Sequence, residues 1–280
     1  MVIVPTHKPA ELVEVGEPRA QKLHVASFGD GGTGKSRFIV TAPGPIGVLP
    51  LNGKCRATIE RCRQELCPHK KIYFPRQDLL RHANPMKLAM MNPFCENNAL
   101  KIGINAPECC ARHYYRWHVN REKDAFWTMV EDKEIRTIAI DDGSAIYDDI
   151  LYAIYGRNNR ISADKTAYGP VNQEMVELIY SASEKHLIIT NQAKDEYKGP
   201  TATGRDTVKG FREIGFHVNV LAEFARDPVK QSFFLNVRMC QDNAGLHGDG
   251  GQKLLKDDDI TFVNLATKIF GEDIDYTEYM

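Results

Sequence analysis

The chain lacks the features of a membrane protein or a secreted protein. None of its apolar runs approaches the roughly 18 consecutive residues of a membrane-spanning helix. Its first residues, 1–9, show no basic start followed by an apolar stretch, which is the pattern of a secretory leader. We therefore expect a cytoplasmic protein without a membrane partner.

An excess of charge of one sign is also missing. The chain has 36 Lys and Arg against 37 Asp and Glu, which gives a formal net charge of −1 over 280 residues. This balance argues against a protein coated with basic residues for nucleic acid, but it leaves a local basic groove open. The length allows one large α/β domain or two small ones, and a hydrophobic content of 42% supplies a sizeable core.

Zinc knuckles of the C-x-x-C type are absent, although the chain has seven cysteines, six of them from Cys55 to Cys110. In a reducing compartment such cysteines are thiols or metal ligands rather than disulfides. Their spacings match no standard zinc ribbon, so buried or free thiols are the favoured interpretation and a zinc site is the alternative. The candidate zinc ligands are Cys55, Cys62, Cys67 and His69 in one group, and Cys95, Cys109, Cys110 and His113 in another.

The strongest positive feature is a phosphate-binding loop. The segment GDGGTGKS matches the pattern G-x-x-x-x-G-K-[ST] at every constrained position. Its glycines let backbone amides close on phosphate oxygens, Lys35 would reach the β- and γ-phosphates, and Ser36 would bind Mg²⁺. A buried strand before the loop and a helix after it supply the context that the motif requires. The predicted ATP-binding residues are Gly29, Asp30, Gly31, Gly32, Thr33, Gly34, Lys35, Ser36 and Arg37.

Further polar residues follow two apolar strands. Asp141 ends a buried strand, where an acid would hold the water shell of Mg²⁺ beside Ser36, so we predict both as magnesium residues. Asp142 is a candidate for orienting the attacking water, and helix capping explains it equally well. Gln192 ends the next strand, where it would sense the γ-phosphate, with turn chemistry as the alternative. The predicted catalytic residues are Lys35, Asp141, Asp142 and Gln192.

Alternating strands and helices predict an α/β fold with a mostly parallel central sheet covered by helices on both faces. We expect a lead-in over 1–21, one core domain over 22–280, and an irregular cysteine-containing insertion over 53–130 within that core. The expected strands are 23–28, 46–51, 135–140 and 186–190, with β-rich runs at 214–224 and 232–239. The expected helices are 36–41, 113–132, 144–155, 171–184 and 260–270.

The segment 188–192, followed by a polar loop and a β-rich run, resembles the core of RecA-type recombinases, as do 138–142 and the P-loop. The pairs Gly156-Arg157 and Tyr168-Gly169 and the segment 185–188 are more similar to phage-encoded RecA-core ATP-binding proteins. The resemblance covers roughly 22–226. It implies a RecA-like P-loop ATPase that uses ATP and Mg²⁺ and assembles into rings or filaments. It also implies action on single-stranded DNA in recombination, annealing or replication, a single-strand binding protein as a further partner, and the host cytoplasm as location.

Two loops are expected at the ligand edge of the sheet, over 156–168 and 193–212. Basic residues interleaved with aromatic ones suit single strands, because charges follow phosphates and rings stack on bases. Solvated polar loops are the alternative. The candidate DNA-binding residues are Arg157, Arg160, Lys165, Lys194, Lys198, Arg205 and Lys209. In an oligomer, Arg205, Lys209 or Arg212 would complete the site of a neighbouring subunit.

One position departs from the family pattern. RecA-type enzymes carry an acidic catalytic base at the end of the strand after the P-loop helix, and this chain has Asn52 there. Asparagine is a poor proton acceptor, so we expect slow hydrolysis, or a base supplied by Asp142 or by the insertion. Two other functions stay open. One is a P-loop kinase whose lid contains Arg157 and Arg160, and the other is a nucleotide-switched assembly factor with little hydrolysis.

Overall fold

The structure is a computed structural model that describes residues 22–76, 106–155, 168–198, 201–227, 229–246 and 253–271. The strands are β1 (His24–Gly29), β2 (Ile46–Pro50), β3 (Ile72–Tyr73), β4 (Thr137–Asp141), β5 (His186–Lys198), β6 (Thr201–Val208), β7 (Val220–Arg226), β8 (Phe233–Cys240) and β9 (Lys253–Lys256). The α-helices are α1 (Lys35–Val40), α2 (Cys55–Leu66), α4 (Ala106–Glu131), α5 (Gly143–Tyr155), α6 (Gly169–Ser181) and α7 (Phe262–Phe270). The 3₁₀ helices are η3 (Arg212–Phe216), η4 (Ala244–Leu246) and η5 (Asp257–Asp259).

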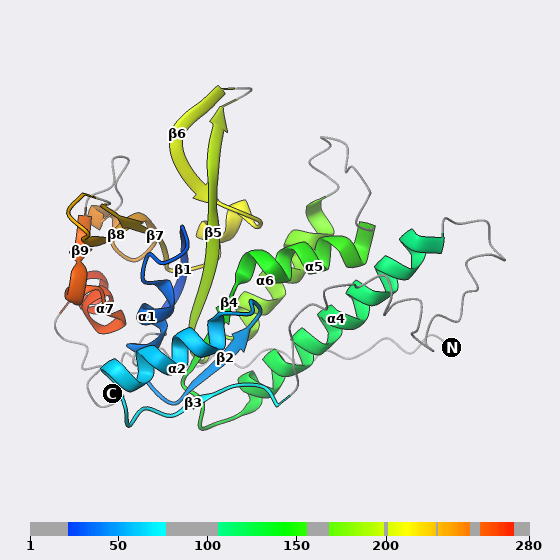
Figure 1. The fold of residues 1–280 in the computed structure, drawn as a ribbon, viewed down its shortest axis with the longest axis horizontal. Helices are drawn as coiled ribbons and strands as arrows, with labels where there is room; N and C mark the ends of the chain where they lie inside the picture. Colours follow the sequence, from blue (N-terminus) through cyan, green and yellow to red (C-terminus); the bar gives the residue numbers. More distant parts are fainter. Residues whose placement is uncertain are drawn as a thin grey trace, which may run out of the picture.

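A nine-stranded sheet forms the centre, in the order β3-β2-β4-β5-β1-β7-β8-β9, with β6 paired to β5 outside this path (Figure 1). The pairs from β3 through to β7 are parallel, while β8 and β9 extend the sheet antiparallel. The expected α/β fold with a mostly parallel sheet and flanking helices is therefore confirmed. Within the described ranges, no helix has the length and apolar character to cross a membrane.

Successive side chains of the central strands point to opposite faces of the sheet, so the core has two layers. In β5, Leu187 and Ile189 pack with residues of α4, α5 and α6, while Ile188 between them packs with residues of α1, α2 and α7. Successive side chains of a strand point to opposite faces, so an apolar run without alternation is buried on both sides. The carboxyl ends of β1 and β4 consequently lie beside the middle of β5, at Thr190 and Gln192, between two helical layers and at the edge where ligands bind in α/β sheets.

The described parts of 53–130 belong to the core. β3 pairs with β2 at the edge of the sheet, and α2 and α4 contribute to opposite helical layers. Helix α4 begins at Ala106, earlier than the expected start at 113, because a proline near the first position is compatible with a helix. The expected strand at 214–224 begins only at Val220, after η3.

The largest difference from the sequence prediction is a two-stranded arm. Within the loop expected over 193–212, β5 instead continues to Lys198, and β6 returns antiparallel to it. The arm, which we define as 193–198 and 201–208, extends beyond the rest of the sheet (Figure 1). Most of β6 is exposed, and backbone pairing rather than apolar burial holds it in place. Its polar sequence therefore lacks the apolar pattern by which a strand is recognised.

Candidate functional site

The P-loop connects β1 to α1, and glycine is required at two of its turns. A Cβ atom on Gly29, whose φ is +151°, would lie 2.2 Å from the carbonyl oxygen of Phe224. Gly34 has a φ of +99° immediately before α1. Since residues with side chains rarely adopt such angles, the motif folds here as a tight, glycine-dependent loop, and its binding of phosphate stays a prediction.

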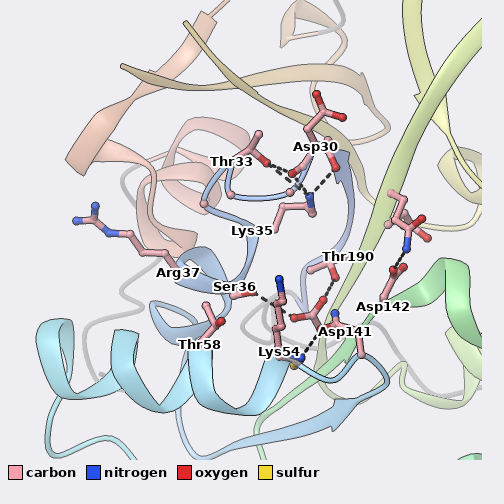
Figure 2. A pocket seen from close by; sticks show the side chains of 18 of the residues that line it. Asp30, Thr33, Lys35, Ser36, Arg37, Lys54, Thr58, Asp141, Asp142 and Thr190 are labelled. Carbon is pink, nitrogen blue, oxygen red and sulfur yellow. Dashed lines mark hydrogen bonds between the residues drawn. The ribbon is translucent and has the colours of Figure 1, made fainter. Parts of the chain in front are cut away.

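Lys35 points into this loop, as Figure 2 shows. Its Nζ donates hydrogen bonds to the carbonyl oxygens of Gly29 at 2.6 Å and Asp30 at 2.7 Å. Burial lowers the pKa of Lys35, and the nearby Asp141, Asp142 and Asp30 oppose this shift. The amine therefore lies among the loop's backbone groups, where a lysine of this motif contacts phosphates.

Asp141 occupies the end of β4, with 5% of its surface exposed. Its Oδ2 accepts a hydrogen bond from the Ser36 hydroxyl at 3.2 Å, and its Oδ1 accepts one from the Thr190 hydroxyl at 2.6 Å. Hydroxyl and carboxylate oxygens are hard ligands that suit Mg²⁺, so these residues fit a magnesium ion beside the P-loop. Thr190 holds the carboxylate in place, and its alignment with Asp141 in the β4–β5 pair explains why.

Cys55 lies next to Asp141 and bears on the zinc alternative. Burial raises the pKa of its thiol strongly, and the charge of Asp141 and a hydrogen bond to it raise that pKa further. Burial also raises the pKa of Cys62. Among the described side chains the cysteines form no group with metal-ligand spacing. Cys95 and the side chains of Cys109, Cys110 and His113 lie outside the described part.

A chain of hydrogen bonds links the site to the arm. The Nε2 of Gln192 donates to Asp142 Oδ2 at 2.6 Å, and Lys209 Nζ donates to Gln192 Oε1 at 2.9 Å. Asp142 Oδ1 accepts from the backbone amide of Ser144 at 2.8 Å, and the Ser144 hydroxyl accepts from the amide of Gln192 at 3.0 Å. Asp142 thus both caps α5 and contacts Gln192, at the point where β5 leaves the sheet.

The cavity over the P-loop has a volume of about 660 Å³. Besides the expected residues it is lined by Asn52 and by side chains of the β2–α2 segment, three of which sequence reasoning missed: Lys54, Thr58 and Arg61. Lys54 extends from the start of α2 into this cavity (Figure 2). Lys54 could have been found from the sequence, because it follows Asn52 by only two residues. The side-chain oxygen of Asn52 accepts a hydrogen bond from the backbone amide of Lys54 at 3.1 Å. A cation therefore lies near the position where the family pattern has an acid.

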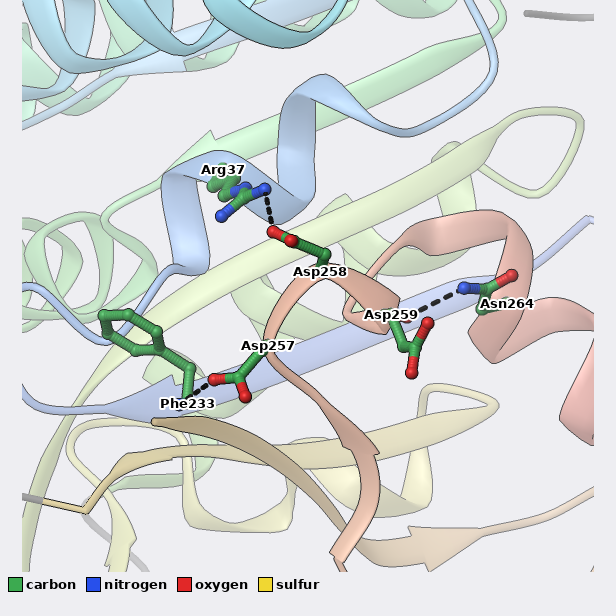
Figure 3. A network of polar contacts seen from close by, with 6 residues as sticks. All are labelled: Arg37, Phe233, Asp257, Asp258, Asp259 and Asn264. Atoms are coloured by element: carbon green, nitrogen blue, oxygen red, sulfur yellow. Dashed lines mark hydrogen bonds and ion pairs between the residues drawn. The ribbon is translucent and has the colours of Figure 1, made fainter. Parts of the chain in front are cut away.

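Arg37 lines the same cavity, but its guanidinium turns toward η5. It pairs with Asp258 at 2.7 Å, within a network in which Asp257 accepts from the Phe233 amide (Figure 3). The carbonyl oxygen of Asp259 accepts from the Asn264 side chain at 2.9 Å, which joins η5 to α7. In this structure the Arg37 side chain therefore connects α1 to η5, in the carboxyl-terminal part of the described chain. Its contact with ATP stays a prediction.

The predicted DNA-binding residues divide into two groups. Lys194, Arg205 and Lys209 lie on the arm or at its base, and burial lowers the pKa of Lys194, with Arg212 and Lys209 adding to the shift. Acidic side chains alternate with them, and burial raises the pKa of Asp206. Arg157, Arg160 and Lys165 lie outside the described residues, as does the side chain of Lys198.

No model of a known protein family matches the chain, and no curated protein matches it. Among solved structures it is similar to the RadB recombinase, with a TM-score of 0.40 and 10% identity, over 85% of this chain and 86% of that one. It is also similar to a KaiC-like protein from the archaeon Pyrococcus horikoshii OT3, with a TM-score of 0.36 and 12% identity, over 81% of this chain and 82% of that one. These likenesses are weak, and the strand order and the position of the P-loop by themselves show an α/β fold with a mostly parallel sheet.

Proposed function

We propose that this protein is a Mg²⁺-dependent ATP-binding protein and a DNA-dependent ATPase, whose arm contacts single-stranded DNA in one nucleotide state. The observation that carries the proposal is the path from Asp142 through Gln192 to Lys209. This path begins at the expected position of the γ-phosphate and ends at the base of the arm. Loss of the γ-phosphate would change the contacts of Gln192 and hence the orientation of the arm.

In the proposed reaction, water attacks the γ-phosphorus and the bond to the β-phosphate oxygen breaks, releasing ADP and phosphate. Lys35 and the backbone amides of the P-loop stabilise the charge that develops on the phosphate oxygens. Mg²⁺, held by Ser36 and Asp141, would neutralise charge on the β- and γ-phosphates. Both oxygens of Asp142 already accept hydrogen bonds, which suits orientation of the water rather than rapid removal of its proton.

A nucleotide-switched assembly factor with little hydrolysis is the second candidate function. Asn52 favours it, because no acid follows β2 and the cavity instead receives Lys54 there. In both functions we propose a homo-oligomeric ring or filament, in which Arg205, Lys209 or Arg212 completes a neighbouring site. A single-strand binding protein is a further proposed partner. Nothing in the described part of the chain favours the kinase, whose predicted lid residues Arg157 and Arg160 lie outside it.

The test is steady-state ATP hydrolysis by the purified protein with and without single-stranded DNA, beside a Lys35→Ala variant. The proposal predicts turnover that rises with DNA and is lost in the variant, because Lys35 is the cation inside the P-loop. Turnover indifferent to DNA would contradict the DNA-dependent function. Tight ATP binding without turnover would select the assembly factor and point to Asn52 as the reason.

A further inference from the structure

Three buried side chains meet between α4 and α5, outside the ATP cavity. His118 and Glu122 lie one turn apart on α4, and Asp149 faces them from α5. Their exposed fractions are 1%, 0% and 1%, and one ligand atom from each lies within 4.8 Å of the others. None of the three lines the cavity over the P-loop.

We propose that His118, Glu122 and Asp149 bind one divalent transition-metal ion, with Zn²⁺ as the preferred ion. The distance from His118 Nδ1 is 3.1 Å to Glu122 Oε1 and 3.8 Å to Asp149 Oδ2. In a tetrahedral zinc site with bonds of about 2.0–2.1 Å, neighbouring ligand atoms are about 3.3–3.4 Å apart. These two spacings bracket that value, and all three ligand atoms lie within 4.8 Å of one another, so one ion fits after small side-chain shifts.

The chemistry of the ligands selects the class of ion. An imidazole nitrogen suits zinc and other late transition metals, whereas an all-oxygen group would suit Mg²⁺ or Ca²⁺. Two ionised carboxylates, a neutral imidazole and a divalent cation together carry no net charge. A neutral cluster costs far less to bury than carboxylates of the same sign held close together.

Burial also decides what the ion would do. The ring of Tyr114 lies 5.8 Å from the His118 ring, and the three ligands lie in the layer where α4 packs on α5. Such a site admits no substrate, so its role is to fix α4 against α5. Because α5 begins directly after Asp142, the ion would stabilise the helix that carries one end of the path to the arm.

The experiment is a metal analysis of the full-length protein, purified without nucleotide and exposed to equimolar Zn²⁺ before desalting. The variants are Glu122→Gln and Asp149→Asn, and the matched control is Asp124→Asn, an exposed carboxylate on the same helix. Wild type and control should retain one ion per chain. The variants should lose affinity by at least about 100-fold, since loss of even an outer-shell partner costs about 10- to 100-fold. A chelator should lower the Tm of wild type and control only.

Cobalt substitution separates this site from the cysteines. Co²⁺ bound through nitrogen and oxygen gives ligand-field bands without the thiolate charge-transfer band that cysteine ligands produce. That spectrum on wild type would support the proposal even if a variant failed to fold. Three results would overturn it: no metal retained by wild type, retention unchanged in Glu122→Gln and Asp149→Asn, or a thiolate band.

Discussion

Replacement of Gln192 by alanine tests whether the site and the arm communicate. The side chain bridges Asp142 at 2.6 Å and Lys209 at 2.9 Å, so alanine removes both contacts and leaves the P-loop untouched. A hydrogen bond to a charged group contributes about 1.5–3 kcal/mol, and the solvent-exposed Lys209 bond lies at or below the lower end of that range. We therefore expect Gln192→Ala to remove about 1–3 kcal/mol of coupling, which corresponds to about a 5- to 150-fold effect on affinity.

The assay measures the affinity for a fluorescent single-stranded oligonucleotide with and without a non-hydrolysable ATP analogue. In wild type the analogue should change that affinity within the range given above, and in Gln192→Ala the ratio should approach one. By linkage, DNA should change analogue affinity by the same factor. The control is Gln173→Ala, because Gln173 is an exposed glutamine whose side chain bonds only to Glu177 among the described residues.

An unchanged ratio in Gln192→Ala would refute the path from Asp142 to Lys209. A protein that binds DNA in no nucleotide state would refute the proposed function before this path is tested.

Two further predictions concern the scaffold. Gly29→Ala should lower the free energy of unfolding in urea by about 1–3 kcal/mol, because the added Cβ would clash with the Phe224 carbonyl oxygen. Gly31→Ala is the control, since open space surrounds Gly31 and its stability should not change. Equal stability of the two variants would contradict this reasoning. Burial, with smaller effects of Lys22 and His24, lowers the pKa of His186 from 6.5 to about 3. The unfolded state therefore binds the extra proton, stability falls as the pH drops below 6.5, and this residue should cost about 2 kcal/mol at pH 5. His186→Asn keeps an acceptor for the Leu23 amide, and its stability should depend less on pH between 7 and 5. An unaltered slope of unfolding free energy against pH would contradict the role of His186.

The parts of the site that lie close together in sequence were predictable. The P-loop is a local motif, and a buried strand that ends in an acid places Asp141 at the ligand edge of the sheet without further information. The Ser36–Asp141 contact joins residues 105 positions apart, yet the phosphate chemistry of the motif anticipates it. Local pattern and a known chemical role together sufficed.

Contacts that depend on strand order were not predictable. Thr190 contacts Asp141 only because β4 and β5 are neighbours in the sheet. The pattern of apolar residues along the chain does not indicate which strands pair. The same holds for the buried triad. His118 and Glu122 share a helix face that the sequence indicates, but Asp149 joins them only through the packing of α4 on α5.

The arm was missed for a different reason, and that reason bears on its function. β5 runs for 13 residues, and among the described strands its outer half pairs only with β6. An isolated two-stranded ribbon is marginally stable in water, because it buries little apolar surface. We therefore expect a surface that covers the arm to stabilise it. Lys194 and Arg205 suit a phosphate backbone, while Asp195 and Asp206 beside them suit a basic face of a second subunit. Salt sensitivity of DNA binding in Arg205→Ala separates the two: a reduced slope assigns the arm to DNA, and an unchanged slope with loss of the oligomer assigns it to the neighbouring subunit.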